Sequence, residues 1–481
     1  MENHYLLVSK WISPIFLVYF TGLNAMYLIL ILFGSIKTYL RIRELNREDF
    51  TNILRSNSLP EITFLVTAYN ESHHIVSAIK NLAHLSYRYK KIIIINDGST
   101  DNTMETLQQA LELTPIPCFY EDKLPTKPIR GIYRSGIHPE VIVIDKENGK
   151  KFDALNAGLN ACNTAYFITA DADTFIDNSS FEAIIRPILT SPETVAAGAS
   201  VRLRNGCSLS YNRISTIGFP QNFISAVQSI EYLRAFLMRQ AWEYTGGHYL
   251  LSGAFAMFST DLVVKLGGYA PTVAEDLEIV FRIHRVLKNT NIPYKITYLP
   301  DPVAWTEGPS TFKALTRQRI NWHRGLLESM WFHRCLFCNS KYGGFGLFVY
   351  PFLFFGEAIE PLVETLGYLF IITGIILGVV NPIFILLFMG ITIGFTFIFT
   401  LFCLLIEELS FRKYPSLKSI VMLLVYSLVE NFGYRQLTLI WRLQGFRSFY
   451  KRYAEIKRDS HNVNESITQA LKKFVNKGET S

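Results

Sequence analysis

A stretch of about 25 residues without a charged side chain, Ile12 to Ile36, limits most strongly how this chain can fold. As a helix rising 1.5 Å per residue, it is longer than the roughly 30 Å hydrocarbon core of a bilayer. We interpret it as an uncleaved transmembrane anchor, because no small-residue cleavage site of a secretory signal is evident. One basic residue, Lys10, precedes the stretch, and four follow it: Lys37, Arg41, Arg43 and Arg47. The positive-inside rule therefore places the downstream chain in the cytosol.

A second apolar region runs from Phe345 to Ile406, and its part from Leu366 onward carries no charge. Asn381 and Pro382 interrupt that part, which predicts two spans joined by a tight outer turn. The mean hydropathy of +0.19 supports a membrane portion, and 18% charged residues and six cysteines exclude a disordered chain and a disulfide scaffold.

Two segments that border these spans are apolar but charged. Phe345 to Tyr368 contains three glutamates, and Ser419 to Leu443 contains a glutamate and two arginines. Each charge costs roughly 2.5 to 3.5 kcal/mol at the centre of a bilayer on insertion scales. The segments are therefore interfacial helices, or they span the membrane only with their charges facing protein: Glu357, Glu360, Glu364, Glu430, Arg435 and Arg442.

The net charge of +7 is concentrated near the membrane borders and in the C-terminal tail. This distribution favours contact with anionic lipid over nucleic-acid binding, and a basic tail predicts a cytosolic C-terminus after an even number of C-terminal spans. We divide the chain into an anchor and linker (1–50), a cytosolic domain (51–340), transmembrane and interfacial helices (341–450) and a basic cytosolic tail (451–481).

Between the membrane regions, short apolar runs alternate with helical patterns. This alternation predicts an α/β domain with a mostly parallel sheet and helices on both faces. In such sheets ligands bind at the carboxyl ends of the strands. The expected strands are Ile62–Val66, Lys91–Ile95, Val141–Ile144 and Tyr166–Thr169, and the expected helices are His74–Leu85, Asn102–Leu113 and Asp153–Cys162.

Three of these strands end in acidic residues that should meet at one edge of the sheet. The first is followed by Glu71, the second by Asp97, and the last by Asp171 and Asp173. A single motif of this kind is weak evidence, because acidic residues also form turns after strands. Two carboxylates one residue apart after a buried strand can nevertheless hold a hard divalent cation that keeps coordination sites for substrate phosphates.

With these motifs the chain resembles the family-two inverting glycosyltransferases of the GT-A fold, in the membrane-bound branch of cellulose, chitin, hyaluronan and poly-N-acetylglucosamine synthases. Thr67 replaces a usual proline, and Asn96 replaces a usual aspartate. The resemblance implies a UDP-sugar donor whose uridine is held by Thr67, Tyr69, Glu71 and Asp97, a diphosphate contact from Lys151, and Mg or Mn on Asp171 and Asp173.

Displacement of UDP with inversion also needs a base on the acceptor side. Ala274-Glu275-Asp276 opens a predicted helix, Asp276 to Leu287, and matches a family motif that implies Asp276 as the base with Glu275 beside it. The alternative is that both are first-turn acids favoured by the helix dipole. Upstream, Ser252 to Phe255 resembles the acceptor segment of the family, next to a predicted helix from Phe219 to Met238.

Gln318-Arg319-Ile320-Asn321-Trp322 lies where processive members of the family have QxxRW. Asn321 replaces the arginine that binds diphosphate, and an amide lacks that charge and bidentate geometry. Arg319 or Arg324 could supply the missing cation. Trp322 suits stacking on an acceptor sugar, although a tryptophan near a membrane can also be an interfacial anchor.

The sequence thus predicts a membrane-integral, metal-dependent inverting glycosyltransferase in the cytoplasmic membrane, with its catalytic domain in the cytosol. It would transfer a hexose or N-acetylhexosamine from a UDP-sugar to a growing β-linked polysaccharide. The alternatives are transfer of one sugar to a polyprenyl phosphate or glycolipid, and a silent nucleotide-binding scaffold. Asn321 is the only argument for the scaffold, and Asp171, Asp173 and Asp276 argue against it.

Overall fold

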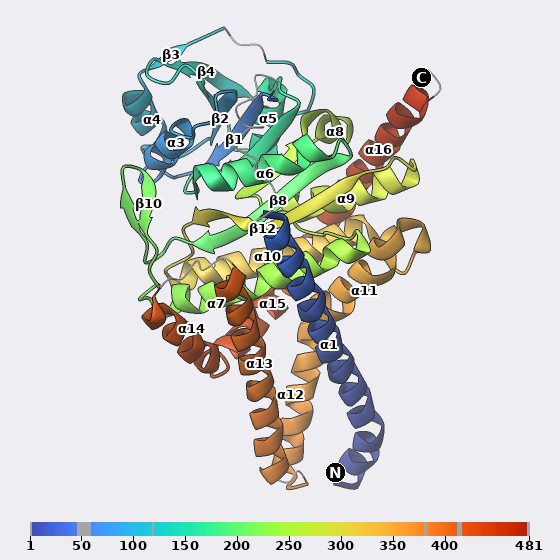
Figure 1. Cartoon of the computed structure of the whole chain (residues 1–481). Coiled ribbons are helices and arrows are strands. Elements are labelled where there is room, and N and C mark those ends of the chain that lie inside the picture. Colours follow the sequence, from blue (N-terminus) through green and yellow to red (C-terminus); the bar gives the residue numbers. More distant parts are fainter. Residues whose placement is uncertain (1, 46–58, 118–119, 380–381, 411–415, 479–481) are drawn as a thin grey trace.

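The computed structural model describes residues 2–45, 59–117, 120–379, 382–410 and 416–478 (Figure 1). Their strands form one large mixed sheet in the order β3-β4-β5-β2-β1-β6-β11-β8-β12-β7, and a hairpin of β9 and β10. The strands are β1 (Ile62–Ala68), β2 (Lys90–Asp97), β3 (Leu113–Pro115), β4 (Ile129–Ser135), β5 (Val141–Lys146), β6 (Tyr166–Asp171), β7 (Phe175–Ile176), β8 (Thr194–Leu203), β9 (Ser208–Ser210), β10 (Arg213–Thr216), β11 (Phe255–Ser259) and β12 (Lys295–Thr306).

The centre of the sheet is parallel, as predicted. β5, β2, β1 and β6 are neighbours that run in the same direction, and they are the four strands expected from the sequence. Their apolar, β-branched runs are buried on both faces, as the burial of all of Ile92 to Ile95 shows. β11 then runs antiparallel to β6 and β8, which makes the sheet mixed.

Helices pack on both faces of this sheet. α3 (Ile75–Ala83), α4 (Thr103–Leu111) and α6 (Asn178–Thr190) share one apolar core with it, and α5 (Lys151–Ala161), α8 (Thr260–Lys265) and α9 (Glu275–Asn289) share another. The predicted helices agree with α3, α4, α5 and α9 to within a few residues. The arrangement confirms the α/β fold of the GT-A type.

Three helices extend away from the α/β domain: α1 (Glu2–Leu45), α12 (Glu360–Ile376) and α13 (Pro382–Ser410) (Figure 1). Ser13–Glu44 and Ile393–Ser410 are long and apolar enough to cross a membrane, and α12 makes a third span if it is counted with the bent segment Phe345–Ala358. That segment comprises η4 (Phe345–Val349), α11 (Tyr350–Phe352) and η5 (Leu353–Ala358).

The end of α12 and the start of α13 lie at the same far end of the molecule as the N-terminus (Figure 1). The predicted pair of C-terminal spans requires these two helix ends to lie on the same side. Asn381 itself lies outside the described residues. The molecule is therefore built as a membrane protein.

The charged residues of the two bordering segments pair with protein. Arg442 contacts Glu360 at 2.5 Å and Glu357 at 3.5 Å. Arg435 lies 3.6 Å from Glu364. Glu430 binds Arg234 of α7 (Phe223–Ala241) at 2.5 Å. Mutual pairing therefore offsets part of the cost that these charges would have in an apolar setting.

Four helices join the two parts of the molecule: α7, α10 (Phe312–Phe332), α14 (Leu417–Val429) and α15 (Tyr434–Lys451). α7 lies against α1, and α10 packs along α15 (Figure 1). The short 3-10 helices η1 (Trp242–Thr245), η2 (Arg334–Leu336) and η3 (Ser340–Tyr342) complete the chain before the bent segment.

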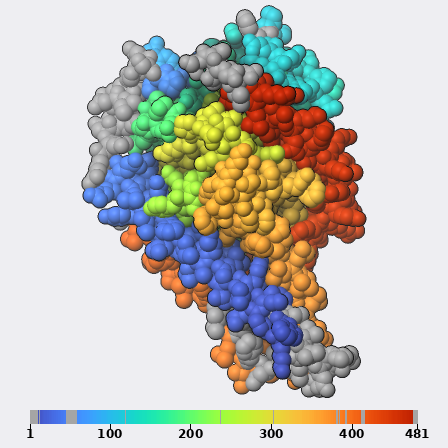
Figure 2. All heavy atoms as spheres, turned by 90° about the vertical axis from the view of Figure 1, so that its right-hand side faces the viewer, coloured from blue at the N-terminus to red at the C-terminus, as the bar shows by residue number. Residues whose placement is uncertain are grey.

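The residues that we expected to form a separate basic tail are instead a helix, α16 (Tyr453–Gly478), packed on the α/β domain. Its apolar residues Ile456, Val463, Ile467 and Ala470 are buried in the same core as α5 and α9. Figure 2 shows these C-terminal residues, in red, along the flank of the domain. Their spacing of three to seven residues is helical, and the basic charges of the segment hid this pattern.

Candidate functional site

The predicted strand ends do meet at one edge of the sheet. Thr67 at the end of β1 pairs with Asp171 at the end of β6, and Ala68 on the other side pairs with Asn96 of β2. The residues expected around the donor are therefore neighbours across the sheet, as parallel pairing requires. Tyr69 follows in the loop after β1 and is half exposed.

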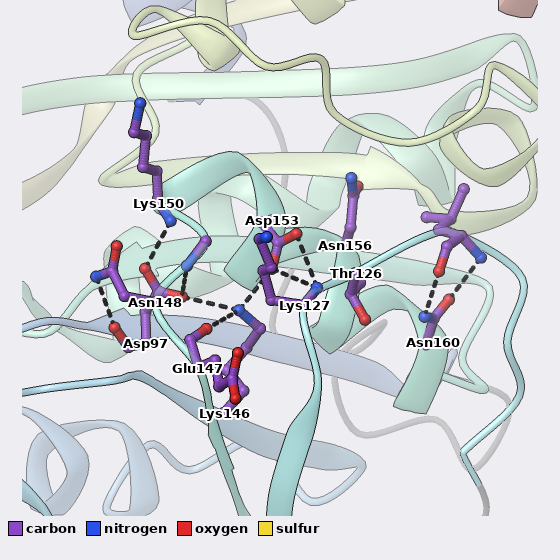
Figure 3. A network of polar contacts seen from close by, with 12 residues as sticks. Asp97, Thr126, Lys127, Lys146, Glu147, Asn148, Lys150, Asp153, Asn156 and Asn160 are labelled. Carbon is purple, nitrogen blue, oxygen red and sulfur yellow. Dashed lines mark hydrogen bonds and ion pairs between the residues drawn. The ribbon is translucent and has the colours of Figure 1, made fainter.

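Asp97 anchors the loop that leads into α5 (Figure 3). One carboxylate oxygen accepts hydrogen bonds from Lys146 Nζ and the backbone N–H of Gly149, both at 2.9 Å, and the other accepts from the N–H of Lys150 at 2.8 Å. Lys146 is fully buried and also pairs with Asp153 at 2.5 Å. Asp97 thus holds the loop that presents Lys151, and it is almost completely buried while doing so.

Lys151, the first residue of α5, connects the donor side to the predicted catalytic pair. Its Nζ lies 2.6 Å from Asp171 and 3.5 Å from Glu275. Burial opposes its charge, but Asp171 and Glu275 raise the pKa of Lys151 above its ordinary value, so it stays cationic. Gly253 lies between these groups, where a Cβ atom would come within 3.1 Å of the Lys151 amine. A larger residue at 253 would crowd the centre of the site.

Acidic groups gather on the other side of Asp171. Burial, Asp173 and Asp171 together raise the pKa of Glu71 to about 7. Burial and Asp171 also raise the pKa of Asp173, although its oxygens accept hydrogen bonds from Thr306 Oγ1 at 2.9 Å and the Glu307 N–H at 3.1 Å. The cluster therefore carries more negative charge than its protein partners neutralise.

This excess of negative charge fits a divalent cation. All the donors are oxygens, which Mg²⁺ and Mn²⁺ prefer. Within the described residues, no group of three or more His, Cys, Asp or Glu side chains is close enough to enclose an ion. A cation on Asp171 and Asp173 would therefore need oxygens from elsewhere, and a bound diphosphate can provide them.

Glu275 and Asp276 open α9 but differ in accessibility. Glu275 is 6% exposed, and burial raises its pKa to about 7 despite the nearby Lys151. Asp276 is less buried, and its two oxygens accept backbone N–H bonds from Leu277 at 2.9 Å and Gly253 at 3.3 Å. Burial also raises the pKa of Asp276. Asp276 is thus the more accessible carboxylate of this pair.

Helix α10 positions the segment that precedes this pair. Glu328 accepts a hydrogen bond from Thr272 Oγ1 at 2.8 Å, and Gly325 lies so close to Ala274 that a Cβ atom on it would clash. Arg324 lies beside Glu328 at 3.3 Å and bonds Ser448 of α15 at 3.1 Å. Arg324 therefore supports α10, and the structure does not bring it to the acidic cluster.

Arg319 and Trp322 lie together on another part of α10. The guanidinium of Arg319 is 4.6 Å from the Trp322 ring centroid and pairs with Glu231 of α7 at 2.5 Å. Both line a cavity of about 300 Å³ among α7, α10, η5 and α15. Its other lining residues are Glu231, His323, Leu326, Glu357, Thr438 and Arg442. Gln318, one residue before Arg319, is partly buried and does not line this cavity.

Three supporting residues were not predicted from the sequence. Glu307 follows directly after β12, a strand that we did not predict. Had this strand been predicted, a search for acidic residues at strand ends would have found Glu307. Its partner Arg204 follows β8 in the same way, and it also lies 3.1 Å from His74. Glu328 had no such signal, because its role depends on how α10 packs against residues far away in sequence.

Comparisons with known proteins agree with this geometry. Residues 63–267 match the model of "Glycosyl transferase family 2", and residues 166–405 match that of "Glycosyl transferase family group 2". A poly-β-1,6-N-acetyl-D-glucosamine synthase of Staphylococcus aureus is 29% identical over 343 residues, 70% of each chain. The enzyme of the same name from Staphylococcus epidermidis is 27% identical over 277 residues, 56% of each chain.

A solved mannosyltransferase of Pyrobaculum calidifontis, in complex with GDP-Man and Mn²⁺, superposes with a TM-score of 0.48 at 16% identity. It covers 85% of this chain and 99% of its own. The two family models together extend from the first strand of the α/β domain into α13, and they include every strand end that carries the acidic cluster. The chain therefore belongs to the family-two glycosyltransferases.

Proposed function

We propose that this protein elongates a β-linked polysaccharide of N-acetylglucosamine, with a UDP-sugar as donor, on the cytosolic side of the membrane. The observation that carries the proposal is the position of Lys151, which contacts Asp171 of the donor cluster and Glu275 of the catalytic pair. The Lys151 amine thereby lies between the diphosphate side and the acceptor side of the site. The names of the staphylococcal relatives support the choice of sugar.

In this proposal the uridine lies at the ends of β1 and β2, beside Thr67, Tyr69 and Glu71, on the loop that Asp97 holds. Lys151 faces the diphosphate and offsets its charge as UDP leaves. Asp276 removes the proton from the acceptor hydroxyl as this attacks the anomeric carbon from the opposite face, which inverts the configuration. Glu275 stays paired with Lys151 and keeps it in position.

Asp171 and Asp173 would hold Mg²⁺ or Mn²⁺ together with the donor phosphates. When bound, the ion would neutralise charge that develops on the leaving diphosphate. The mutual repulsion within the acidic cluster supports this assignment, because a divalent cation would relieve it.

The cavity beside Trp322 favours a polymer as acceptor over transfer of a single sugar. It begins at an indole face, which suits stacking on a pyranose ring, and it continues towards η5 and α15 at the membrane helices. Its lining also includes polar side chains that suit sugar hydroxyls, among them Glu231, Arg319 and Thr438.

The pH dependence of turnover should report the catalytic pair. A carboxylate acts as a base only when unprotonated, and burial raises the pKa of Glu275 to about 7 and that of Asp276 as well. We therefore expect kcat/KM to be high above the pKa values of this pair and to fall as the pH drops through them. Lys151 lowers the pKa of Glu275, so Lys151→Gln should move this acid limb to higher pH.

The measurement is kcat/KM for UDP release between about pH 5 and 9. The pH at the midpoint of the acid limb is compared between Lys151→Gln and the unchanged protein, because this midpoint does not depend on a uniform loss of donor affinity. Lys150→Gln is the matched control, because the Lys150 side chain points away from Asp97 and its loop (Figure 3). An acid limb that stays in place in Lys151→Gln would show that the catalytic pair does not set it.

The proposed function is tested by UDP release from the full chain in lipid nanodiscs, with Mg²⁺ or Mn²⁺ and a panel of UDP-sugars. We expect release with UDP-N-acetylglucosamine and a long labelled product that a β-N-acetylglucosaminidase degrades. A lipid-extractable product that carries one sugar would identify the single-transfer reaction. Release with a different UDP-sugar only would overturn the choice of donor.

A further inference from the structure

A cavity of about 490 Å³ lies where the end of α1 meets the α/β domain. None of its described lining residues belongs to the acidic cluster at the strand ends. It is enclosed by the last turns of α1, α6 and α7 and by the first half of β12. Gln240 at its inner wall is buried and bonded to Thr38 of α1, so the walls are held together. The cavity is separate from the one beside Trp322.

The charge of this cavity is positive. Among the residues that the structure describes, five cations line it, Lys37, Arg41, Arg43, Arg186 and Lys295, against two carboxylates, Glu44 and Glu243. Asp301 lies just outside and binds Arg41 through two bonds of 2.9 and 3.0 Å, and Lys37 pairs with Glu243 at 3.1 Å. Even with Asp301 counted, cations exceed carboxylates by five to three. The cavity therefore suits an anion.

Its position relative to the membrane narrows the kind of anion. The α1 span ends at Glu44, so the cavity lies at the end of a membrane helix. Directly before it, α1 exposes Phe33, Ile36 and Leu40 by 41 to 45%. Tyr244, which is half exposed, stacks near Phe33 and beneath the Lys37 amine. Aromatic rings beside cations at the end of a span are typical of the membrane interface.

We propose that this cavity binds the phosphate headgroup of an anionic phospholipid, drawn from the leaflet that faces the α/β domain. The headgroup would enter among Arg43, Lys295 and their neighbours, and the acyl chains would lie along the exposed apolar side of α1. An apolar path joined to a basic cavity fits a molecule with both parts. A soluble phosphate would use the basic groups but leave the apolar path unused.

Lipid retention tests the proposal. The full chain is purified from nanodiscs of phosphatidylcholine and phosphatidylglycerol, and the lipids that remain bound are counted by native mass spectrometry. Each cation near a membrane surface contributes about fivefold to the affinity for anionic lipid. We therefore expect Arg43→Gln/Lys295→Gln to retain roughly a tenth or less of the phosphatidylglycerol that the unchanged protein retains, with equal retention of phosphatidylcholine.

The control is Arg130→Gln/Arg134→Gln, which removes two exposed cations from β4, at the end of the α/β domain away from the membrane helices (Figure 1), and should leave retention unchanged. Arg43→Gln alone should give an intermediate loss and guards against misfolding of the double variant. Equal phosphatidylglycerol retention by the cavity variant and the unchanged protein would overturn the proposal. So would calorimetric binding of glycerol 3-phosphate that depends on Arg43 and Lys295 while lipid retention does not, because the site would then serve a soluble phosphate.

Discussion

Asp276→Asn should reduce turnover by about 10²- to 10⁴-fold, because an amide cannot accept the acceptor's proton and base catalysis contributes a factor of that size. The change keeps the size of the side chain and its hydrogen bond from the Gly253 N–H. Donor binding should therefore change by less than about threefold, since the lost charge faces the acceptor. The measurement pairs single-turnover UDP release with calorimetric binding of UDP.

Asp261→Asn is the matched control for this prediction. Asp261 is also a first-turn acid, on α8, but its side chain is 71% exposed and pairs with Lys265. If Asp276 only stabilised α9 through the helix dipole, both substitutions would lower the free energy of unfolding by a similar, small amount, under about 1 kcal/mol. Turnover above a tenth of normal in Asp276→Asn would rule out Asp276 as the base and leave the dipole explanation.

Lys146→Met should strongly destabilise the α/β domain and abolish donor binding. The substitution keeps the length of a fully buried side chain but leaves the carboxylates of Asp97 and Asp153 without their shared cation. Removal of one partner from a buried ion pair costs about 3 to 5 kcal/mol. At about 2 to 4 °C per kcal/mol, this lowers the Tm by roughly 6 to 20 °C. The loop that carries Lys151 would lose its anchor at the same time.

Thermal unfolding in detergent, followed by intrinsic fluorescence, gives the Tm of this variant. Lys91→Met on the neighbouring strand β2 is the control, because Lys91 pairs with Glu61 at the surface and such pairs contribute about 0 to 1 kcal/mol. A Tm of Lys146→Met within about 2 °C of the Lys91→Met value would contradict the prediction, because it would mean that the two carboxylates tolerate burial without this lysine.

The sequence was sufficient to predict the parallel centre of the sheet because its strands are unusually clear. Apolar runs such as Ile92 to Ile95 are too short to be buried helices, and acidic residues mark where they end. Since the carboxyl ends of parallel strands lie at one edge, the order of strands and helices along the chain is enough to place Asp97 and Asp171 together. The GT-A fold follows from the same pattern.

Other parts depend on packing between residues far apart in the chain, which no local pattern records. The glutamates between Phe345 and Tyr368 are costly in a membrane as isolated charges, but Arg442 lies beside Glu357 and Glu360. Arg319 and Arg324 were equal candidates for the missing cation. In the structure Arg319 pairs with Glu231 beside the cavity, whereas Arg324 pairs with Glu328 and supports α10. The role of Asp97 in holding a loop likewise depends on Lys146, a single lysine within an apolar strand.

The pairing of Arg234 with Glu430 also has a consequence for biosynthesis. The two residues are 196 positions apart, and α7 is therefore complete long before its partner leaves the ribosome. At about 5 to 20 residues per second, this interval is about 10 to 40 s. For that time α7 has its Arg234 side unpaired while α12 and α13 are still being inserted. The α/β domain therefore reaches its final contact with the membrane helices only when synthesis is almost finished, and chains truncated before α14 should be preferred targets of quality-control proteases.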